Sequence, residues 1–132
     1  MPTKSSNLVK HINVLRDGKF IRMPTETVVE LGHKIGHIIA GNPGVGFAYA
    51  NIRDSKPHFH NHTTEWYLVT RGTGKLLLDG KEMQIIPLDV VMIPPGVTHA
   101  VKSENGLDTF VLSSPPWRKE DHILRDLKSM KR

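Results

Sequence analysis

Hydrophobic residues after position 33 fall in short runs that are rich in β-branched side chains. Between the runs stand turn residues, in the stretches "GNPG", "RGTG", "LDGK", "IPPG" and "SENG". Many short runs separated by turn residues are typical of a β-sandwich or a β-barrel. The predicted strands cover residues 34–40, 45–52, 65–70, 75–78, 82–86, 90–93, 99–102 and 108–112.

Only two residues, Asp79 and Gly80, separate two of these runs. A two-residue loop of this kind joins antiparallel strands through a turn with positive φ, which glycine adopts without a steric penalty. The pair therefore predicts a tight β-hairpin.

The pattern changes after Pro115 and Pro116. Proline cannot donate to a strand ladder, so this pair ends the last strand. Beyond it the apolar residues recur on one face of a helix, with acidic residues in its first turn and basic residues in its last. These apolar residues are Ile123, Leu124, Leu127 and Met130. The sequence therefore predicts a short C-terminal α-helix that packs on the barrel.

We interpret the chain as a single domain in three parts. Residues 1–33 hold only short apolar pieces without a sustained period and are expected to be an N-terminal tail and arm. Residues 34–115 are the predicted barrel, and residues 116–132 are the predicted helix. A chain of 132 residues is long enough to bury one ordinary hydrophobic core.

Composition limits the chemistry and the partners. The chain has no cysteine, which excludes disulfides, thiolate metal sites and a cysteine nucleophile. No stretch approaches the roughly 20 apolar residues of a membrane span, and no signal peptide is evident, so we expect a cytoplasmic protein without a membrane partner. The net charge is +5, but residues 20–115 hold eight Lys and Arg against nine Asp and Glu. The positive excess lies at the two ends, and no nucleic-acid partner is expected.

The stretch "KPHFHNHTTEWYLV" contains candidate metal ligands. Residues i and i+2 of a strand face the same way, so His58 and His60 are expected to point together into the barrel. Glu65 has the opposite parity and joins them only if a turn lies between, which we place at residues 61–64. Once Glu65 points inward, Tyr67 and Val69 point inward as well.

A fourth candidate ligand lies in the stretch "IPPGVTH". His99 begins the strand after this proline and glycine turn, where its side chain can return to the barrel interior. Three neutral imidazoles and one carboxylate suit a divalent transition metal, namely Fe, Mn, Ni, Co, Cu or Zn. The predicted metal ligands are His58, His60, Glu65 and His99, and no residue is assigned to an organic cofactor.

The first of these stretches resembles a motif of the cupin superfamily. The motif H-x-H-x(3–4)-E-x(6)-G is matched at His58, His60, Glu65 and Gly72. The resemblance implies an all-β fold, the cupin double-stranded β-helix or jelly-roll barrel. It covers roughly residues 34–115, and the "SSPPWRKED" stretch also resembles the tail of many single-domain cupins.

The second cupin motif, G-x(5)-P-x-G-x(2)-H-x(3)-N, is matched at Pro94, Gly96 and His99. Leu88 stands in place of its first glycine, and Ser103 stands in place of its asparagine. Cupins often lose both of these positions, and all four ligand positions are present.

Alternatives remain open for several residues. The four ligand-type residues could instead form a polar network that lines a metal-free cavity. His62 is expected to be exposed in the turn, although a shifted register would use His60 and His62. Tyr67 is the candidate catalytic residue, as an acid, a base or a donor to the substrate, or else a core tyrosine with a satisfied hydroxyl. Tyr49 is a weaker candidate of the same kind.

The resemblance implies two classes of function. Some cupins are isomerases, lyases or dioxygenases in which a metal ion binds an oxygen-bearing small molecule. Some small lyases of the superfamily carry a tyrosine two residues after the metal glutamate, as Tyr67 is here. Other cupins bind a sugar or a small acid without turnover, often beside a DNA-binding domain, which we do not expect in this chain. We expect an enzyme with a small-molecule ligand, and a homodimer that forms through residues before 34 and after 115.

Overall fold

The structure is a computed structural model, and it describes residue 16 and residues 19–23, 26–35 and 45–125. These ranges consist mainly of β-strands with a single 3₁₀ turn, η1 (Lys119–Asp121). Within them, no helix is long and apolar enough to cross a membrane. The strands are β1 (Lys19–Met23), β2 (Glu26–Ile35), β3 (Val45–Asp54), β4 (His58–Phe59), β5 (Thr64–Arg71), β6 (Gly74–Leu78), β7 (Lys81–Ile85), β8 (Val90–Ile93), β9 (His99–Ser114) and β10 (Ile123–Leu124).

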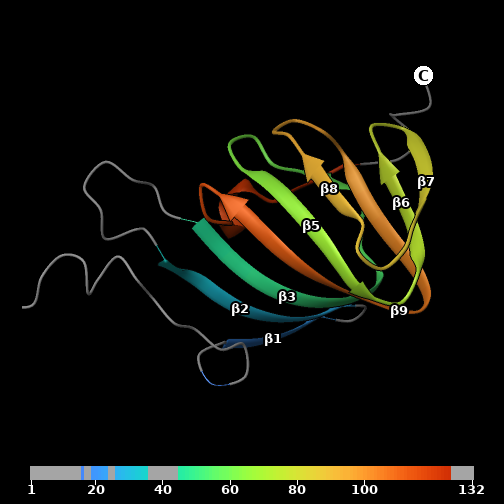
Figure 1. Cartoon of the computed structure of the whole chain (residues 1–132). Helices are drawn as coiled ribbons and strands as arrows, with labels where there is room; N and C mark the ends of the chain where they lie inside the picture. Colours follow the sequence, from blue (N-terminus) through green and yellow to red (C-terminus); the bar gives the residue numbers. More distant parts are fainter. Residues whose placement is uncertain (1–15, 17–18, 24–25, 36–44, 126–132) are drawn as a thin grey trace, which may run out of the picture.

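The long strand β9 connects the two halves of an antiparallel sheet. Residues 99–102 pair with β6, whereas residues 108–114 pair with β5, and β3 lies on the other side of β9. Figure 1 shows β9 running beside β3 and β2 on one side and beside β5 and β8 on the other. The strands enclose an interior, as expected for a jelly-roll barrel.

The sequence predicts separate strands at residues 99–102 and 108–112, with a turn at "SENG" between them. The structure instead joins them in the single strand β9. Gly106 has a φ of +94° and lies where β9 exchanges β6 for β5 as its partner. Glycine tolerates this conformation, so the chain bends from one half of the sheet to the other without reversing.

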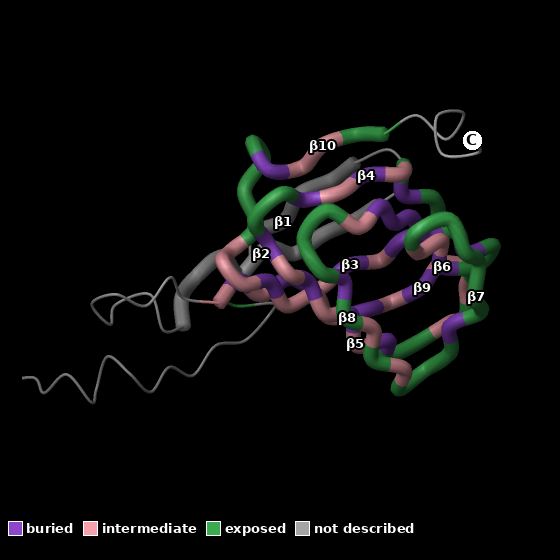
Figure 2. Tube along the Cα trace, turned by 90° about the horizontal axis from the view of Figure 1, so that it is seen from above, coloured by how far each residue is buried: buried purple, intermediate pink, exposed green. Residues whose placement is uncertain are grey.

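Alternation along the strands separates the interior from the outer face. Val69 on β5, Thr109 on β9 and Ala50 on β3 are directly paired and at most 2% exposed. Trp66 and Leu68 on β5 have the opposite parity and are half-buried. This confirms the predicted parity of β5, and Figure 2 shows buried positions alternating with half-buried ones along β3 and β5. The core is formed by Ala50, Ile52, Tyr67, Val69, Leu76, Ile85, Ile93, Val101 and Leu107.

Two short connections have the backbone geometry that their sequences require. The predicted hairpin is confirmed, because Leu78 pairs with Lys81 and both Asp79 and Gly80 have positive φ, of 51° and 82°. Gly72 also has a positive φ, of 83°, and a Cβ atom there would collide with the carbonyl oxygen of Gly106. Close backbone approach therefore explains the last glycine of the first motif.

The N-terminal region contributes strands to the same sheet. β1 and all but the last two residues of β2 lie within residues 1–33, which the sequence interpretation assigns to a tail and arm. β2 pairs with β3 and extends the sheet beyond it. The predicted strand at residues 34–40 begins inside β2, and residues 36–40 lie outside the described residues.

The predicted C-terminal α-helix is wrong for the residues that the structure describes. Residues 119–121 form η1, and Ile123 and Leu124 form β10, which pairs with β4. The side chain of Asp121 accepts hydrogen bonds from the backbone at residues 61–63, and this contact holds the segment against the barrel in place of helical hydrogen bonds. The rest of the predicted helix, residues 126–132, lies outside the described residues.

Candidate metal centre

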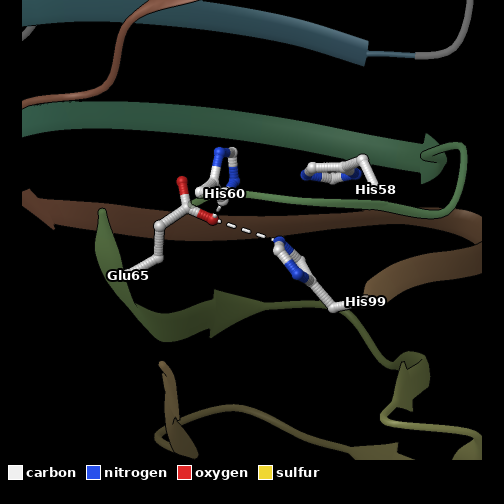
Figure 3. Close-up of side chains that lie close together, drawn as sticks. All are labelled: His58, His60, Glu65 and His99. Carbon is white, nitrogen blue, oxygen red and sulfur yellow. Dashed lines mark hydrogen bonds and ion pairs between the residues drawn. The ribbon is translucent and has the colours of Figure 1, made fainter. Parts of the chain in front are cut away.

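Four ligand-type side chains from separate parts of the chain meet inside the barrel. They are His58, His60, Glu65 and His99, and one ligand atom from each lies within 4.8 Å of those of the other three. Each of the four residues is at most 6% exposed. Figure 3 shows the three imidazole rings gathered around the side of the Glu65 carboxylate. The structure therefore brings together the four residues that the sequence singles out as ligands.

Local pairing explains how these side chains converge. His58 pairs directly with His99 across β4 and β9, so both rings stand on the inner face. His58 and His60 are buried while Phe59 between them is half-buried, which confirms the predicted alternation. Bends at Asn61 and His62 separate this pair from β5, whose first inward residue is Glu65.

Backbone carbonyl groups fix the protonation pattern of all three rings. The Nδ1 atoms of His58, His60 and His99 lie 2.7, 2.8 and 3.0 Å from the carbonyl oxygens of Lys56, Asp121 and Val97. A carbonyl oxygen can only accept, so each Nδ1 carries a proton and donates it. Each Nε2 is therefore the atom available to a ligand, which is the arrangement typical of metal-binding histidines.

The Glu65 carboxylate is the negative charge at the centre of the cluster. Its Oε1 lies 3.1 Å from Nε2 of both His60 and His99. Burial raises the pKa of Glu65, but hydrogen bonds from the two imidazoles and their charges outweigh burial and lower this pKa below its usual range. Two lone pairs on Nε2 and Oε1 would repel each other, so the contact requires a proton between the two atoms or a metal cation bound to both.

Two histidines of the cluster respond to this environment in opposite ways. Burial, reinforced by the charges of His99 and His122, lowers the pKa of His58 from 6.5 to about 3. Burial also lowers the pKa of His60, but the hydrogen bond and charge of Glu65 outweigh burial and raise it. The metal-free cluster therefore holds its first proton near Glu65 and keeps His58 neutral, as a metal ligand must be.

The donor set fits a divalent transition metal. Histidine nitrogens bind such ions at about 2.1 Å, so two ligands on opposite sides of an ion lie about 4.2 Å apart. A largest separation of 4.8 Å exceeds this by about 0.6 Å, so the two side chains need to close by about 0.3 Å each. Three imidazoles and one carboxylate leave coordination positions open on a six-coordinate ion.

The other candidates from the sequence lie in different surroundings. Tyr67 is 4% exposed on the inner face of β5, and its ring meets that of His99 edge to face with the centroids 6.2 Å apart. Tyr49 is on the outer face of β3, where its hydroxyl lies 3.1 Å from Oγ1 of Thr70 and its ring packs on Phe110. His62 is exposed in the turn. The geometry therefore groups Tyr67 with the cluster and leaves Tyr49 and His62 outside it.

Sequence reasoning missed two residues beside the cluster, Asp121 and His122. The carbonyl oxygen of Asp121 accepts the Nδ1 proton of His60, and the His122 ring stacks on His58 at a centroid distance of 4.0 Å. Both lie about sixty residues after their partners, in a segment whose apolar spacing indicates a helix. Asp121 ends the "SSPPWRKED" stretch that resembles a cupin tail, but nothing in that stretch indicates a contact with the ligands.

Comparison with known proteins places this geometry in a family. A family model described as an AraC-like ligand-binding domain matches residues 43–131, which include the whole cluster. The chain belongs to this family. The AraC-like ligand-binding domain seen here has the cupin fold that the two motifs imply. A comparison with curated protein sequences finds no match.

Solved structures similar to this ligand-binding domain support the same fold. Streptomyces PAC13, solved as a variant with uridine, has a TM-score of 0.73 at 12% identity over 89% of this chain and 92% of that chain. A protein from Planctomyces limnophilus has a TM-score of 0.70 at 22% identity, covering 88% and 96%. KdgF from Halomonas sp. has a TM-score of 0.61 at 18% identity, covering 83% and 95%. At these identities the likeness establishes the fold alone.

Proposed function

We propose that this cupin is a metal-dependent enzyme that acts on a small oxygen-bearing metabolite. The observation that carries the proposal is the cluster itself, in which three Nε2 atoms and a carboxylate converge while every Nδ1 is held by a carbonyl group. A polar network without a metal would need no such uniform orientation of three rings. Fe, Mn, Ni, Co, Cu and Zn all accept this donor set.

His58, His60, Glu65 and His99 would hold the ion. When bound, the ion polarises a carbonyl or carboxylate group of the substrate, which lowers the barrier to enolisation, elimination or reaction with oxygen. The backbone carbonyl groups on the three Nδ1 atoms keep the rings in one orientation as substrate enters and product leaves. The apolar core beyond the cluster excludes water from the inner side of the site.

Tyr67 is the proposed catalytic residue. It shares the inner face of β5 with Glu65 and lies two residues further along the strand, against the ring of His99. A phenol in this position reaches a substrate held beside the four ligands, and it can donate a proton to a leaving oxygen or remove one from carbon. The description of the structural neighbour Pac13 as a nucleoside dehydratase keeps elimination chemistry among the reactions considered.

A second candidate function is small-molecule binding without turnover. The family description, an AraC-like ligand-binding domain, favours it. In this case the pocket would bind a sugar or a small carboxylate and release it unchanged.

The remaining proposals concern the localisation, the oligomeric state and the partners of the protein. We infer a cytoplasmic homodimer with no nucleic-acid or membrane partner. The near balance of charge over residues 20–115 supports the absence of a polyanion partner. A second copy of the chain is supported by the outer face of the sheet, where Val90 and Met92 on β8 are 64% and 55% exposed.

The test of the proposal is the metal content of protein purified without chelators. We expect about one transition-metal ion per chain in the wild type, measured by inductively coupled plasma mass spectrometry, and less than about a tenth of that in His99→Ala and Glu65→Gln. His62→Ala is the matched control, because this exposed histidine lies outside the cluster and its loss leaves the content unchanged.

A metal-free wild type would contradict the proposal. If that protein still binds sugars or small acids in calorimetry, the binding function replaces the enzyme. Metal retained equally in His99→Ala and wild type would show that the ion lies elsewhere.

A further inference from the structure

The segment formed by residues 117–125, which we name the C-terminal strap, lies across the outside of the metal centre. Ile123 and Leu124 pair with Phe59 and His58 of β4. The backbone N–H of Arg125 donates to the carbonyl oxygen of Pro57 at 2.9 Å. The strap thus completes the sheet at the strand that carries the first histidine ligand.

Asp121 is the most strongly connected residue of the strap. It is 3% exposed, and its carboxylate accepts hydrogen bonds from three consecutive backbone N–H groups, those of Asn61, His62 and Thr63, at 2.7, 3.1 and 3.2 Å. Its own carbonyl oxygen accepts the Nδ1 proton of His60 at 2.8 Å. One residue therefore holds both a ligand ring and the turn that leads from this ligand to Glu65.

His122 forms the second contact of the strap with the cluster. Its ring lies flat on that of His58, with 4.0 Å between the centroids and 12° between the planes. The indole N–H of Trp117 donates to Nδ1 of His122 at 3.3 Å and orients this ring. The strap thereby covers one ligand and holds another from outside.

We propose that the C-terminal strap is a positioning element of the metal centre and that Asp121 is its principal positioning residue. The inference rests on the proposed metal function. His60 and Glu65 are joined by a short turn of polar residues whose backbone N–H groups have no strand partners. The Asp121 carboxylate satisfies three of these groups at once, so the turn has one conformation and the two ligands keep a fixed separation. Without this carboxylate the buried N–H group of Thr63 lacks an acceptor and the N–H groups of Asn61 and His62 lose theirs, so the turn must rearrange.

Residues that hold metal ligands from outside typically contribute tenfold to hundredfold in metal affinity. We therefore expect Asp121→Asn to raise the dissociation constant for Co²⁺ at least about tenfold. Asparagine has the same shape as aspartate, but one of its two terminal atoms is an NH₂ group. Both carboxylate oxygens of Asp121 accept backbone hydrogen bonds, so in the variant an NH₂ group would face a backbone N–H donor in place of an acceptor. Glu120→Gln is the matched control, since it removes the same charge from the neighbouring exposed residue, and it should change the constant less than about twofold.

The experiment titrates the full-length metal-free protein with Co²⁺ and records the visible absorption of the bound ion. Thermal unfolding of each variant shows whether it is folded. A changed shape of the Co²⁺ absorption bands in Asp121→Asn is also expected, because altered ligand geometry changes the spectrum whereas a general loss of stability does not.

A second pair of variants tests the positioning role of the strap if Asp121→Asn does not fold. His122→Ala removes the ring that stacks on His58 and should weaken Co²⁺ binding, whereas His122→Phe keeps a flat ring and should recover most of the lost affinity. Folded variants of Asp121 or His122 with the wild-type constant and spectrum would overturn the role of the strap alone. A wild type that binds no Co²⁺ would overturn the metal function and the strap inference together.

Discussion

The environment of each side chain, rather than its type, decides its chemistry in this site. His58 and His60 are two residues apart, yet the pKa of His58 is lowered to about 3 and that of His60 is raised. The difference arises because burial of His58 is reinforced by the charges of His99 and His122, whereas the hydrogen bond and charge of Glu65 outweigh burial at His60. In the metal-free cluster, the same residue type therefore binds a proton more tightly at position 60 and less tightly at position 58.

These opposite shifts predict how the metal-free protein responds to acid. A lowered pKa means that His58 contributes stability fully above pH 6.5, and this contribution is lost as the pH falls from 6.5 toward 3. The raised pKa of His60 acts in the opposite sense, because its contribution is present below pH 6.5 and is lost as the pH rises through the folded-state pKa. We expect the free energy of unfolding, measured with urea between pH 4.5 and 8, to be greatest near pH 6.5.

The variant His58→Asn tests the contribution of His58 to the loss of stability below pH 6.5. It should remove about 1.4 kcal/mol per pH unit, the value for one proton, from the slope near pH 4.5 and about half of that near pH 6.5, where the unfolded-state imidazole is half protonated. Half-buried His122, whose pKa burial also lowers, accounts for part of the slope that remains. An equal slope in His58→Asn and wild type would contradict the assignment.

The phenol of Tyr67 can be separated from the metal ligands by mutation. Tyr67→Phe keeps the ring that packs in the core and against His99 but removes the hydroxyl. We expect kcat to fall about 10²-fold to 10⁴-fold, as for loss of a general acid or base, while metal content stays close to wild type. Tyr49→Phe, on the outer face of β3, should leave kcat unchanged. Full turnover in Tyr67→Phe would leave this residue as a core tyrosine only.

This chain departs from the second cupin motif in the connection between β7 and β8. Leu88 occupies the position of the first glycine in the second cupin motif, and its φ is +75°. Its backbone N–H donates to the carbonyl oxygen of Val69 at 2.7 Å, which holds the connection between β7 and β8 against β5. Leu88 therefore has the left-handed backbone conformation that favours glycine. This conformation costs a residue other than glycine about 1–2 kcal/mol.

Leu88→Gly should consequently stabilise the protein. The relief of about 1–2 kcal/mol is offset by about 0.5–1 kcal/mol, because glycine has more freedom to lose on folding. Little burial is lost, since Leu88 is 80% exposed. We expect a net gain of about 0.5–1 kcal/mol in the free energy of unfolding from urea denaturation. Leu88→Ala retains the Cβ atom and should change stability little, so equal stability of the glycine and alanine variants would contradict this account.

The molecule as a whole has two differently used faces. Paired residues on the outer face of the sheet form an apolar row from Met92 through Trp66 and Leu112 to Phe47. The parallel row contains Val90, Leu68, Phe110 and Tyr49. The inner face carries the candidate metal centre and the core. The sequence suggests dimer contacts before residue 34 and after residue 115, whereas these apolar rows favour the outer face of the sheet for association with a second copy of the chain.

Association through this face predicts a dimer that two charges can disrupt. The wild type should scatter light as twice its chain mass of 14.8 kDa at micromolar concentration. The double variant Val90→Lys and Met92→Lys should be a folded monomer, because both side chains are more than half exposed and their replacement leaves the core intact. Gln84→Lys adds a charge to exposed β7 and should remain dimeric. A monomeric wild type, or a dimeric double variant, would contradict the arrangement.

Some features of this protein follow from local sequence alone. The alternation of residues along β5, the Asp79 and Gly80 hairpin and the two ligand motifs depend on period and spacing, and these are properties of a few neighbouring residues. These patterns predict the barrel. They also predict that the side chains of His58, His60, Glu65 and His99 point into its interior, because the alternation of side chains along a strand fixes the face that each nearby residue occupies.

Only the tertiary structure decided how the C-terminal segment folds. Its apolar spacing favours a helix, but the described part forms η1 and β10, because Asp121 finds three backbone donors in the turn after His60 and Ile123 pairs with Phe59. Those partners lie about sixty residues away. The joining of two predicted strands into β9 has the same origin, since the choice between a turn and a bend at Gly106 depends on β5 and β6. Contacts between distant parts of the chain outweigh the small free energies that local propensity contributes, and they leave no pattern in the segment that they reshape.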